Sequence, residues 1–233
     1  MIYGGKRKAV TFSYDDGVTQ DERLVRMLNR YGLKGTFNLN SELLGKKWEL
    51  VREGVTVNHT KIDPDAIAEV YRGHEVAAHT LTHPMLTKCE DAEIVRQVEC
   101  DRENLSRLVG YEVVGMAYPG GGVNFSEHVA DVIRKNTGIR YARTTVASYG
   151  FDEPEDLYTL KPTVYHVMEL DRLFECGKRF LDEATEGILY VWGHSYEFDI
   201  HDTWDRMEEF CAMIAGHDDI FYGTNKEILL GEV

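Results

Sequence analysis

Two pairs of polar residues in this 233-residue sequence have the types and the spacing of a hydrolytic metal site. Asp15 and Asp16 follow the largely apolar run at residues 9–14, and His79 and His83 stand four positions apart after a second short run. Two imidazoles and one carboxylate around a divalent cation leave coordination positions open for water and substrate, unlike a closed structural site. The pattern therefore predicts a catalytic metal, with the second aspartate free to act as a base.

Each half of this pattern also has a simpler explanation. Asp and Gly are common where a chain turns, so the aspartates before Gly17 could only form a turn, and the histidines could simply lie on the surface. A turn accounts for one aspartate better than for two, because adjacent carboxylates repel each other unless a cation or hydrogen bonds compensate. Different surroundings can give two such carboxyl groups different pKa values. We therefore expect one aspartate to bind metal and the other to move protons.

Charge and composition exclude several kinds of partner. The formal net charge is -14, from 40 acidic and 26 basic residues, and such a field repels phosphate backbones and anionic lipid surfaces. We expect no nucleic acid and no membrane as partner, whereas metal cations and neutral substrates are compatible with this charge. The sequence leaves the oligomeric state open.

The start of the chain and the cysteines indicate a reducing compartment. The first eight residues contain no apolar signal segment, and no window reaches the length of a membrane span. The four cysteines form no C-x-x-C pair, which favours reduced thiols in a chain of this length. The expected location is the cytoplasm.

Strand-like and helix-like segments alternate along the chain, which is typical of repeated βα units around a parallel sheet. Seven strands are predicted, centred on residues 9–13, 35–39, 75–78, 113–117, 140–144, 188–192 and 220–222. Helices are predicted over residues 21–31, 64–71, 91–109, 126–136, 171–184 and 203–215. Residues 48–61 fit neither pattern, and we interpret them as an irregular excursion or a hairpin.

Seven strands with intervening helices predict one α/β domain over residues 1–233, a distorted (β/α)7 barrel one unit short of the TIM-like eight. In such barrels functional groups gather at the carboxyl ends of the strands. The polar clusters of this sequence follow that rule, after the first, third, fourth and sixth strands: Asp15 and Asp16, His79 and His83, residues 118–121, and His194. Four separate regions should therefore meet at one rim.

Four segments together resemble the polysaccharide deacetylase superfamily, also called the NodB homology or carbohydrate esterase family 4 group. They are residues 13–17 (Ser-Tyr-Asp-Asp-Gly), 79–83 (His-Thr-Leu-Thr-His), 117–121 (Ala-Tyr-Pro-Gly-Gly) and 189–194 (Leu-Tyr-Val-Trp-Gly-His). They span most of the chain in the order found in the family, and the first two are the most specific.

The resemblance implies a role for each matching residue. Asp16, His79 and His83 would bind a divalent metal, with Zn²⁺ expected and Co²⁺, Ni²⁺ or Mn²⁺ as alternatives. Asp15 would be the general base and His194 the general acid. Backbone N–H groups near Tyr118 and Gly120 would help to stabilise the oxyanion, since the glycine run lets backbone approach the substrate.

The sequence departs from the family in two motifs. The third motif normally begins with an arginine that orients the base, but here that position is Ala117. We expect Arg143, or Arg140 on the same strand, to replace it. The tryptophan-containing fourth motif has no counterpart around residues 146–148, and Glu197, just after His194, could meet a polar group of the substrate.

Aromatic residues and the other histidines are less informative. Four aromatic residues could stack on sugar faces or could equally be packing residues: Tyr118, Trp192, Tyr196 and Trp204. Six histidines have no useful spacing, and most of them are expected to face solvent or to cap helices: His59, His74, His128, His166, His201 and His217.

These observations together predict a metal-dependent hydrolase that removes an acetyl group from an N-acetylated sugar or a short oligosaccharide. Hydrolysis of O-acetyl esters uses the same groups and remains open, as does hydrolysis of a cyclic amide or imide by a relative of the same superfamily. A protein of another class, a carbohydrate-binding barrel without turnover, is the remaining alternative, and the missing arginine is the observation that favours it.

Overall fold

The first strand is the centre of the structure, a computed structural model that describes residues 3–167 and 170–232. β1 (Lys8–Asp15) is buried at all eight positions, although polar residues alternate with apolar ones from Val10 to Asp15. Such strands lie inside parallel sheets that are covered on both faces. β1 accordingly has neighbours on both of its edges.

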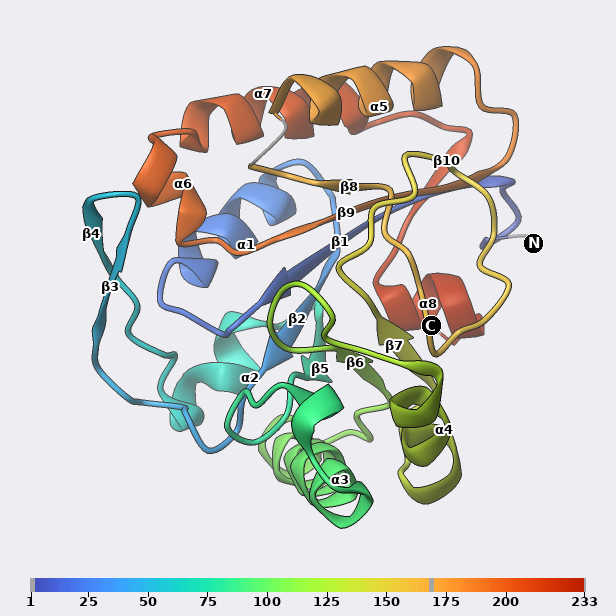
Figure 1. Cartoon of the computed structure of the whole chain (residues 1–233). Helices are drawn as coiled ribbons and strands as arrows, with labels where there is room; N and C mark the ends of the chain where they lie inside the picture. Colours follow the sequence, from blue (N-terminus) through green and yellow to red (C-terminus); the bar gives the residue numbers. More distant parts are fainter. Residues whose placement is uncertain (1–2, 168–169, 233) are drawn as a thin grey trace.

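A parallel sheet surrounds β1 and curls into a half-barrel (Figure 1). Its strand order is β7-β6-β5-β2-β1-β9-β8, with β10 paired to β1 outside this path. The other strands are β2 (Gly35–Leu39), β5 (Glu75–Ala78), β6 (Gly115–Ala117), β7 (Tyr141–Arg143), β8 (Val164–Tyr165), β9 (Gly187–Gly193) and β10 (Ile220–Tyr222). The predicted α/β fold of the (β/α)7 barrel type is confirmed.

The barrel is open between its two outer strands. β7 and β8 do not pair with each other. The long segment that leads to β8 is joined to β7 by a bridge from Arg143 to Leu160 and by a hydrogen bond from the N–H of Ala142 to Leu157. β8 itself was not predicted, because two residues are too few to show any periodicity.

Helices cover the outside of the sheet (Figure 1). They are α1 (Asp21–Arg30), α2 (Ile67–Val70), α3 (Asp91–Val109), α4 (Glu127–Asn136), α5 (Leu170–Asp182), α6 (Glu197–His201), α7 (Trp204–Ile214) and α8 (Asn225–Leu230), with 3₁₀ turns η1 (Pro64–Ala66) and η2 (Leu86–Lys88). The prediction for α3 matches both ends, since Gly110 takes the left-handed conformation that stops the helix.

Two short helices, α6 and α8, were missed by the sequence analysis. Each is shorter than two full turns, so hydrophobic periodicity could not indicate it. A capping box at Thr224 and Glu227 starts α8. Asn225 then enters the barrel, where its side chain contacts Thr11 and donates to the hydroxyl of Tyr190. The first residue of α8 therefore places a polar side chain inside the barrel.

The excursion at residues 48–61 is a hairpin. β3 (Glu49–Arg52) and β4 (Val55–Asn58) pair antiparallel, apart from the main sheet. The hairpin lies beside α6, on the left in Figure 1. This arrangement places the hairpin next to the segment that follows β9.

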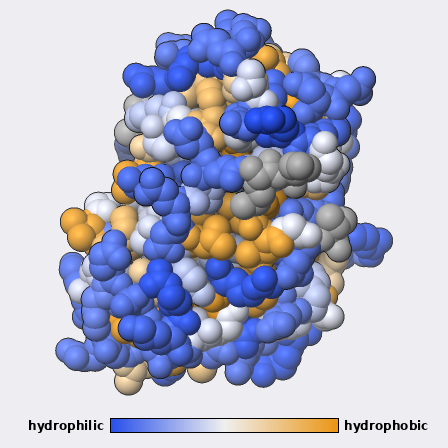
Figure 2. All heavy atoms as spheres, turned by 90° about the vertical axis from the view of Figure 1, so that its right-hand side faces the viewer, coloured by the Kyte–Doolittle hydropathy of each residue, from blue (hydrophilic) through white to orange (hydrophobic). Residues whose placement is uncertain are grey.

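The side of the molecule that carries the N-terminus in Figure 1 is largely hydrophilic, with hydrophobic side chains gathered near its centre (Figure 2). Within residues 3–167 and 170–232, no helix combines the length and the apolar character needed to cross a membrane.

Candidate functional site

The acidic and histidine clusters meet at the carboxyl ends of β1 and β5. Asp16, His79 and His83 each offer one ligand atom, and these atoms all lie within 4.8 Å of one another. The Nε2 atom of His83 is 3.8 Å from a carboxylate oxygen of Asp16. One carboxylate and two imidazoles fit a divalent cation that keeps open coordination positions. In the described part of the chain, this is the one group of acidic, histidine or cysteine residues with such spacing.

The backbone around this group is strained. Asp16, Thr80 and His83 all have positive φ angles, of 83°, 71° and 63°. Residues other than glycine seldom adopt this conformation, and when they do they cluster at functional sites. The adjacent Gly17 has a φ of 59°, and a Cβ there would lie 2.6 Å from Leu39. The turn after β1 therefore requires glycine at position 17 to present Asp16.

His79 is held as a neutral ligand by its surroundings. Its Nδ1 donates to the carbonyl oxygen of Ala117 at 2.8 Å, which leaves the lone pair of Nε2 available. The buried carboxylate of Asp101, on α3, accepts the backbone N–H of His79 at 3.0 Å. Burial lowers the pKa of His79 to about 4 in spite of the nearby Asp15. The imidazole is therefore neutral at physiological pH, as a metal ligand must be.

Asp16 has two further partners from the end of the β3–β4 hairpin. The amine of Lys61 is 3.4 Å from one carboxylate oxygen and donates to the backbone carbonyl of Asp16 at 2.7 Å. Nε2 of His59 lies 3.5 Å from the other carboxylate oxygen. Burial alone would raise the pKa of Asp16, but Lys61 and the hydrogen bond from His59 hold it well below its usual value. Asp16 is therefore an anion that can bind a cation.

Asp15 is paired with a buried arginine. Nη2 of Arg143 donates to both carboxylate oxygens of Asp15, and Asn38 donates to one of them at 2.8 Å. The guanidinium group lies over the ring of Trp192, 4.4 Å from its centroid. Burial raises the pKa of Asp15, but Arg143 and His79 outweigh this effect and lower it. Arg140, the alternative partner considered from the sequence, instead pairs with Glu232 at the surface.

His194 lies near both aspartates and is held by a carboxylate. Its Nδ1 is 3.2 Å from an oxygen of Glu197, the first residue of α6. Burial would lower the pKa of His194, but Glu197 outweighs this effect and raises it to about 9, helped by Asp16 and Asp15. The imidazole is therefore protonated near neutral pH, which is the state that a general acid requires.

Glu197 is the centre of a network on this side of the site. It is 2% exposed, and it is contacted by the hydroxyl of Tyr165, by Nε2 of His166 at 3.1 Å and by Nη1 of Arg52 at 3.0 Å. The sequence analysis assigned Glu197 to a polar group of the substrate. The structure instead turns this carboxylate towards the protein, where it cannot meet substrate directly.

The expectation for the remaining histidines is wrong for three of the six. His59, His74 and His166 are buried rather than exposed or capping. His59 contacts Asp16, and His166 contacts Glu197 and lies against Gly193, where a Cβ would be 1.9 Å from the ring. No spacing motif links these histidines to the site, because tertiary packing alone brings them there.

The glycine-rich segment after β6 was expected to supply backbone N–H groups for the oxyanion, and the structure corrects this expectation for Tyr118. The backbone N–H of Tyr118 donates to the carbonyl oxygen of Arg143 at 2.9 Å, and its buried hydroxyl donates to Tyr158. Tyr118 therefore has no N–H group to offer to a substrate. Among the described residues, nothing accepts the N–H of Gly120. Its φ of 81° favours glycine, and a Cβ there would lie 2.5 Å from the sulfur of Met85.

The four aromatic residues considered for sugar stacking are all buried: Tyr118, Trp192, Tyr196 and Trp204. The ring of Trp192 lies between Arg143 and Tyr165, and the indole of Trp204 donates to Asp199 and stacks with Arg23. Of the two roles left open for these residues, their burial supports packing. The exposed tryptophan near the site is Trp48, which is 43% exposed.

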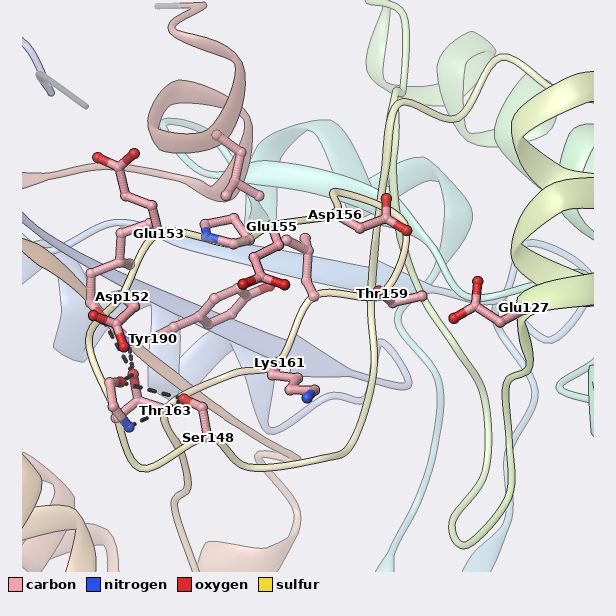
Figure 3. Close-up of a pocket in the computed structure, with 15 residues that line it drawn as sticks. Glu127, Ser148, Asp152, Glu153, Glu155, Asp156, Thr159, Lys161, Thr163 and Tyr190 are labelled. Atoms are coloured by element: carbon pink, nitrogen blue, oxygen red, sulfur yellow. Dashed lines mark hydrogen bonds between the residues drawn. The ribbon is translucent and has the colours of Figure 1, made fainter.

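A separate cavity of about 490 Å³ lies away from the metal cluster, between the segment at residues 148–163 and β9 (Figure 3). Acidic side chains dominate its lining, among them Asp152, Glu155 and Asp156, and Tyr190 also lines it. None of the aspartates and histidines described above contributes to this cavity. The aspartates and histidines of the candidate metal site therefore lie outside this cavity.

Four residues of the site could not be found from the sequence: Arg52, His59, Lys61 and His166. Glu197 was considered because it stands just after His194, but for contact with substrate and not for contact with His194. It begins a helix, where acidic residues are favoured.

Comparison with known proteins is consistent with this geometry. A family model described as polysaccharide deacetylase matches residues 3–142. A chitooligosaccharide deacetylase from Rhizobium leguminosarum bv. phaseoli is 27% identical over 121 residues, 51% of this chain. The matched part is only 43% of that protein, so this chain corresponds to less than half of the relative's length.

Two solved structures show the same fold. A Mycobacterium smegmatis protein, provisionally named a polysaccharide deacetylase, is 15% identical with a TM-score of 0.68, over 97% of this chain and 90% of that one. A pseudoenzyme of carbohydrate esterase family 4 from Bacillus anthracis is 16% identical with a TM-score of 0.56, over 96% of this chain and 66% of that one. At these identities the likeness concerns the fold alone.

Proposed function

The chain belongs to the polysaccharide deacetylase family, and from that premise we propose that it hydrolyses an N-acetyl group on an amino sugar or a short oligosaccharide, releasing acetate and an amine. One observation carries the proposal. The metal-type cluster of Asp16, His79 and His83 has a charged carboxylate, Asp15, beside it, and the protonated imidazole of His194 interacts electrostatically with both aspartates. Amide hydrolysis requires a base, an acid and a means to stabilise an oxyanion.

Asp16, His79 and His83 would hold the metal, which we propose is zinc. When bound, this ion supplies Lewis acidity to the acetyl carbonyl and lowers the pKa of water at the site. The donor set fits this role, since His79 presents a neutral Nε2 and Asp16 is held as an anion. Thr80 and Gly17 give the loops the conformations that bring these ligands together.

Asp15 would take the proton of the attacking water. Both of its oxygens accept from Arg143, so the carboxylate is fixed in orientation and kept charged until the proton arrives. Arg143 would thereby perform the task of the arginine that is missing at Ala117. It reaches Asp15 from β7 rather than β6, and the long guanidinium side chain spans the extra strand.

His194 would donate a proton to the departing amine. Glu197 orients the ring through Nδ1, which leaves Nε2 as the donor towards substrate. The N–H of Gly120 would donate to the oxyanion, since no described group accepts it.

The whole chain would form one deacetylase domain, although the family model matches only residues 3–142. Beyond this match, β9 pairs with β1 from Lys8 to Tyr14 and leads directly to His194. The second part of the chain therefore builds the same sheet and supplies the acid.

A binding protein without turnover is the main competing function, because the fold is also that of a pseudoenzyme. The missing arginine was the reason to consider it, and the contact of Arg143 with Asp15 removes that reason. Hydrolysis of O-acetyl esters or of cyclic imides would use the same residues.

Two measurements on metal-loaded protein separate these functions: acetate release from the acetylated substrates and ring opening of the imide. N-acetylated chitooligosaccharides, an O-acetyl ester and a cyclic imide would be compared as substrates, with an Asp15→Asn variant as the control for contaminating activity. We expect acetate from the N-acetylated sugars in a reaction that the control lacks. Sugar binding without acetate release would support the binding protein instead. Turnover of the imide alone would support the cyclic imide hydrolase.

A further inference from the structure

A row of aromatic rings leads from His194 to the β3–β4 hairpin. The ring of His194 is 5.2 Å from that of Tyr196, which is 4.7 Å from that of His59. The ring of His59 in turn stacks on Trp48, with centroids 5.4 Å apart and an angle of 18°. The last ring of the row is therefore connected to the proposed acid by an unbroken series of contacts.

Trp48 differs from the other rings of the row in its exposure. Tyr196 and His59 are buried, whereas Trp48 is 43% exposed. His59 supports the indole, and the amine of Lys61 lies 5.8 Å from its centroid. Because His59 and Lys61 also contact Asp16, the indole is tied to the proposed metal ligand. A single exposed tryptophan is unremarkable on a surface, but this one is held at the edge of the site.

Arg52 adds hydrogen-bond donors on the same face of the hairpin. Its side chain is 39% exposed, and Nη1 binds Glu197 and the hydroxyl of Tyr196. Among residues 3–167 and 170–232, nothing accepts from its Nε or Nη2. These donors are fixed by the ion pair but still available to a ligand oxygen.

We propose that Trp48 and Arg52 form a second sugar subsite, which holds the residue next to the one that is deacetylated. The inference rests on the proposed function and specifies its substrate as an oligosaccharide of at least two sugars. The apolar face of a pyranose would stack on the indole, and its hydroxyls would accept from the guanidinium group. A neutral sugar also suits a chain of net charge -14.

The subsite is tested by the substrate-length preference of the metal-loaded enzyme. kcat/KM would be measured for N-acetylglucosamine and its β-1,4-linked tetramer with wild type, Trp48→Ala and Trp48→Phe. We expect wild type to have a higher kcat/KM for the tetramer than for the monomer. In Trp48→Ala the ratio of the two values should fall about tenfold, the equivalent of roughly 1.4 kcal/mol of stacking. Trp48→Phe keeps a ring and should retain most of the wild-type ratio.

Val51→Ala is the matched control. Val51 is 69% exposed and precedes Arg52 on β3, so as a neighbouring strand residue it belongs to the opposite face. The substitution should leave both values of kcat/KM unchanged. Metal content is measured for every variant, since Trp48 packs on His59. An equal loss for monomer and tetramer in Trp48→Ala would overturn the subsite, because it would mean that Trp48 acts only through the metal site.

Binding distinguishes failure of the subsite from failure of the proposed function. Calorimetric titration of the metal-loaded Asp15→Asn variant with the tetramer requires no turnover. We expect about tenfold weaker binding when Trp48→Ala is added, and no change on adding Val51→Ala. Equal affinity with and without Trp48 would overturn the subsite even if the enzyme deacetylates sugars.

Discussion

The two carboxylate–arginine pairs beside the proposed metal site differ in construction. Asp15 and Arg143 both come from strands of the barrel, and both side chains are almost fully buried. Glu197 and Arg52 come from α6 and from the β3–β4 hairpin, and the arginine of this pair is 39% exposed. The proposed base is thus held by two strands of the sheet, and the proposed acid by two additions at its rim.

The residues around the proposed base and those around the proposed acid can therefore be changed independently of each other. A buried ion pair of strand residues cannot be altered without leaving a charge uncompensated in the core. A pair at the rim can change with the hairpin that supplies it. We therefore expect the base side to determine whether the chain folds and reacts, and the acid side to determine the pH range and the substrate.

Loss of the base should give the largest effect. Asp15→Asn keeps the shape of the side chain but removes the proton acceptor, so we expect kcat to fall by about 10²–10⁴-fold. Steady-state acetate release measures this loss, and elemental analysis should show unchanged metal content. Retention of more than a tenth of the activity would exclude Asp15 as the base.

Loss of the buried arginine should come next. Arg143→Ala leaves the charge of Asp15 unpaired in the core and should lower the free energy of unfolding by about 3–5 kcal/mol. Urea denaturation measures the change. The double variant with Asp15→Asn should regain a large part of it, since the uncompensated charge is then gone. Equal stability of single and double variants would show that the ion pair is not the cause.

Glu197→Gln should shift the pH dependence without removing activity. His194 must be protonated to act as the acid, so activity is present below its pKa of about 9 and is lost as the pH rises through this value. Without the carboxylate the pKa should fall to about 6.5 or lower, which costs roughly thirtyfold in kcat/KM at pH 8. A profile of kcat/KM from pH 5 to 10 measures the shift. An unmoved basic limb would contradict the assigned partner of His194.

Arg52→Ala should have the smallest effect on stability. A half-exposed ion pair contributes at most about 1 kcal/mol, because solvent screens it. Urea denaturation of Arg52→Ala and Arg143→Ala under the same conditions compares their free energies of unfolding directly. If the two substitutions destabilised the protein equally, the distinction between a buried base side and an adaptable acid side would be lost.

The sequence predicted the parts of the candidate site that lie at the ends of buried strands. Asp15, Asp16 and His79 follow apolar runs that could be recognised without any tertiary information. The same holds for α3, whose two ends agree with the prediction, because its stripe and its terminal glycine are local signals.

The sequence could not predict the contacts made across the rim. Lys61 and His59 reach Asp16 only because the β3–β4 hairpin folds back, and their spacing from Asp16 carries no signal. The N–H of Tyr118 was assigned to substrate because the pairing of β6 with the strand beside it, which consumes this donor, was not visible.

Metal stoichiometry tests the central claim most directly. Protein purified without chelator would be analysed for divalent metals as wild type and as Asp16→Ala, with Asp65→Ala as an exposed control. We expect close to one equivalent of metal, and specifically zinc, in wild type and in the control, and its loss in Asp16→Ala. Equal occupancy in all three proteins would contradict the site formed by Asp16, His79 and His83.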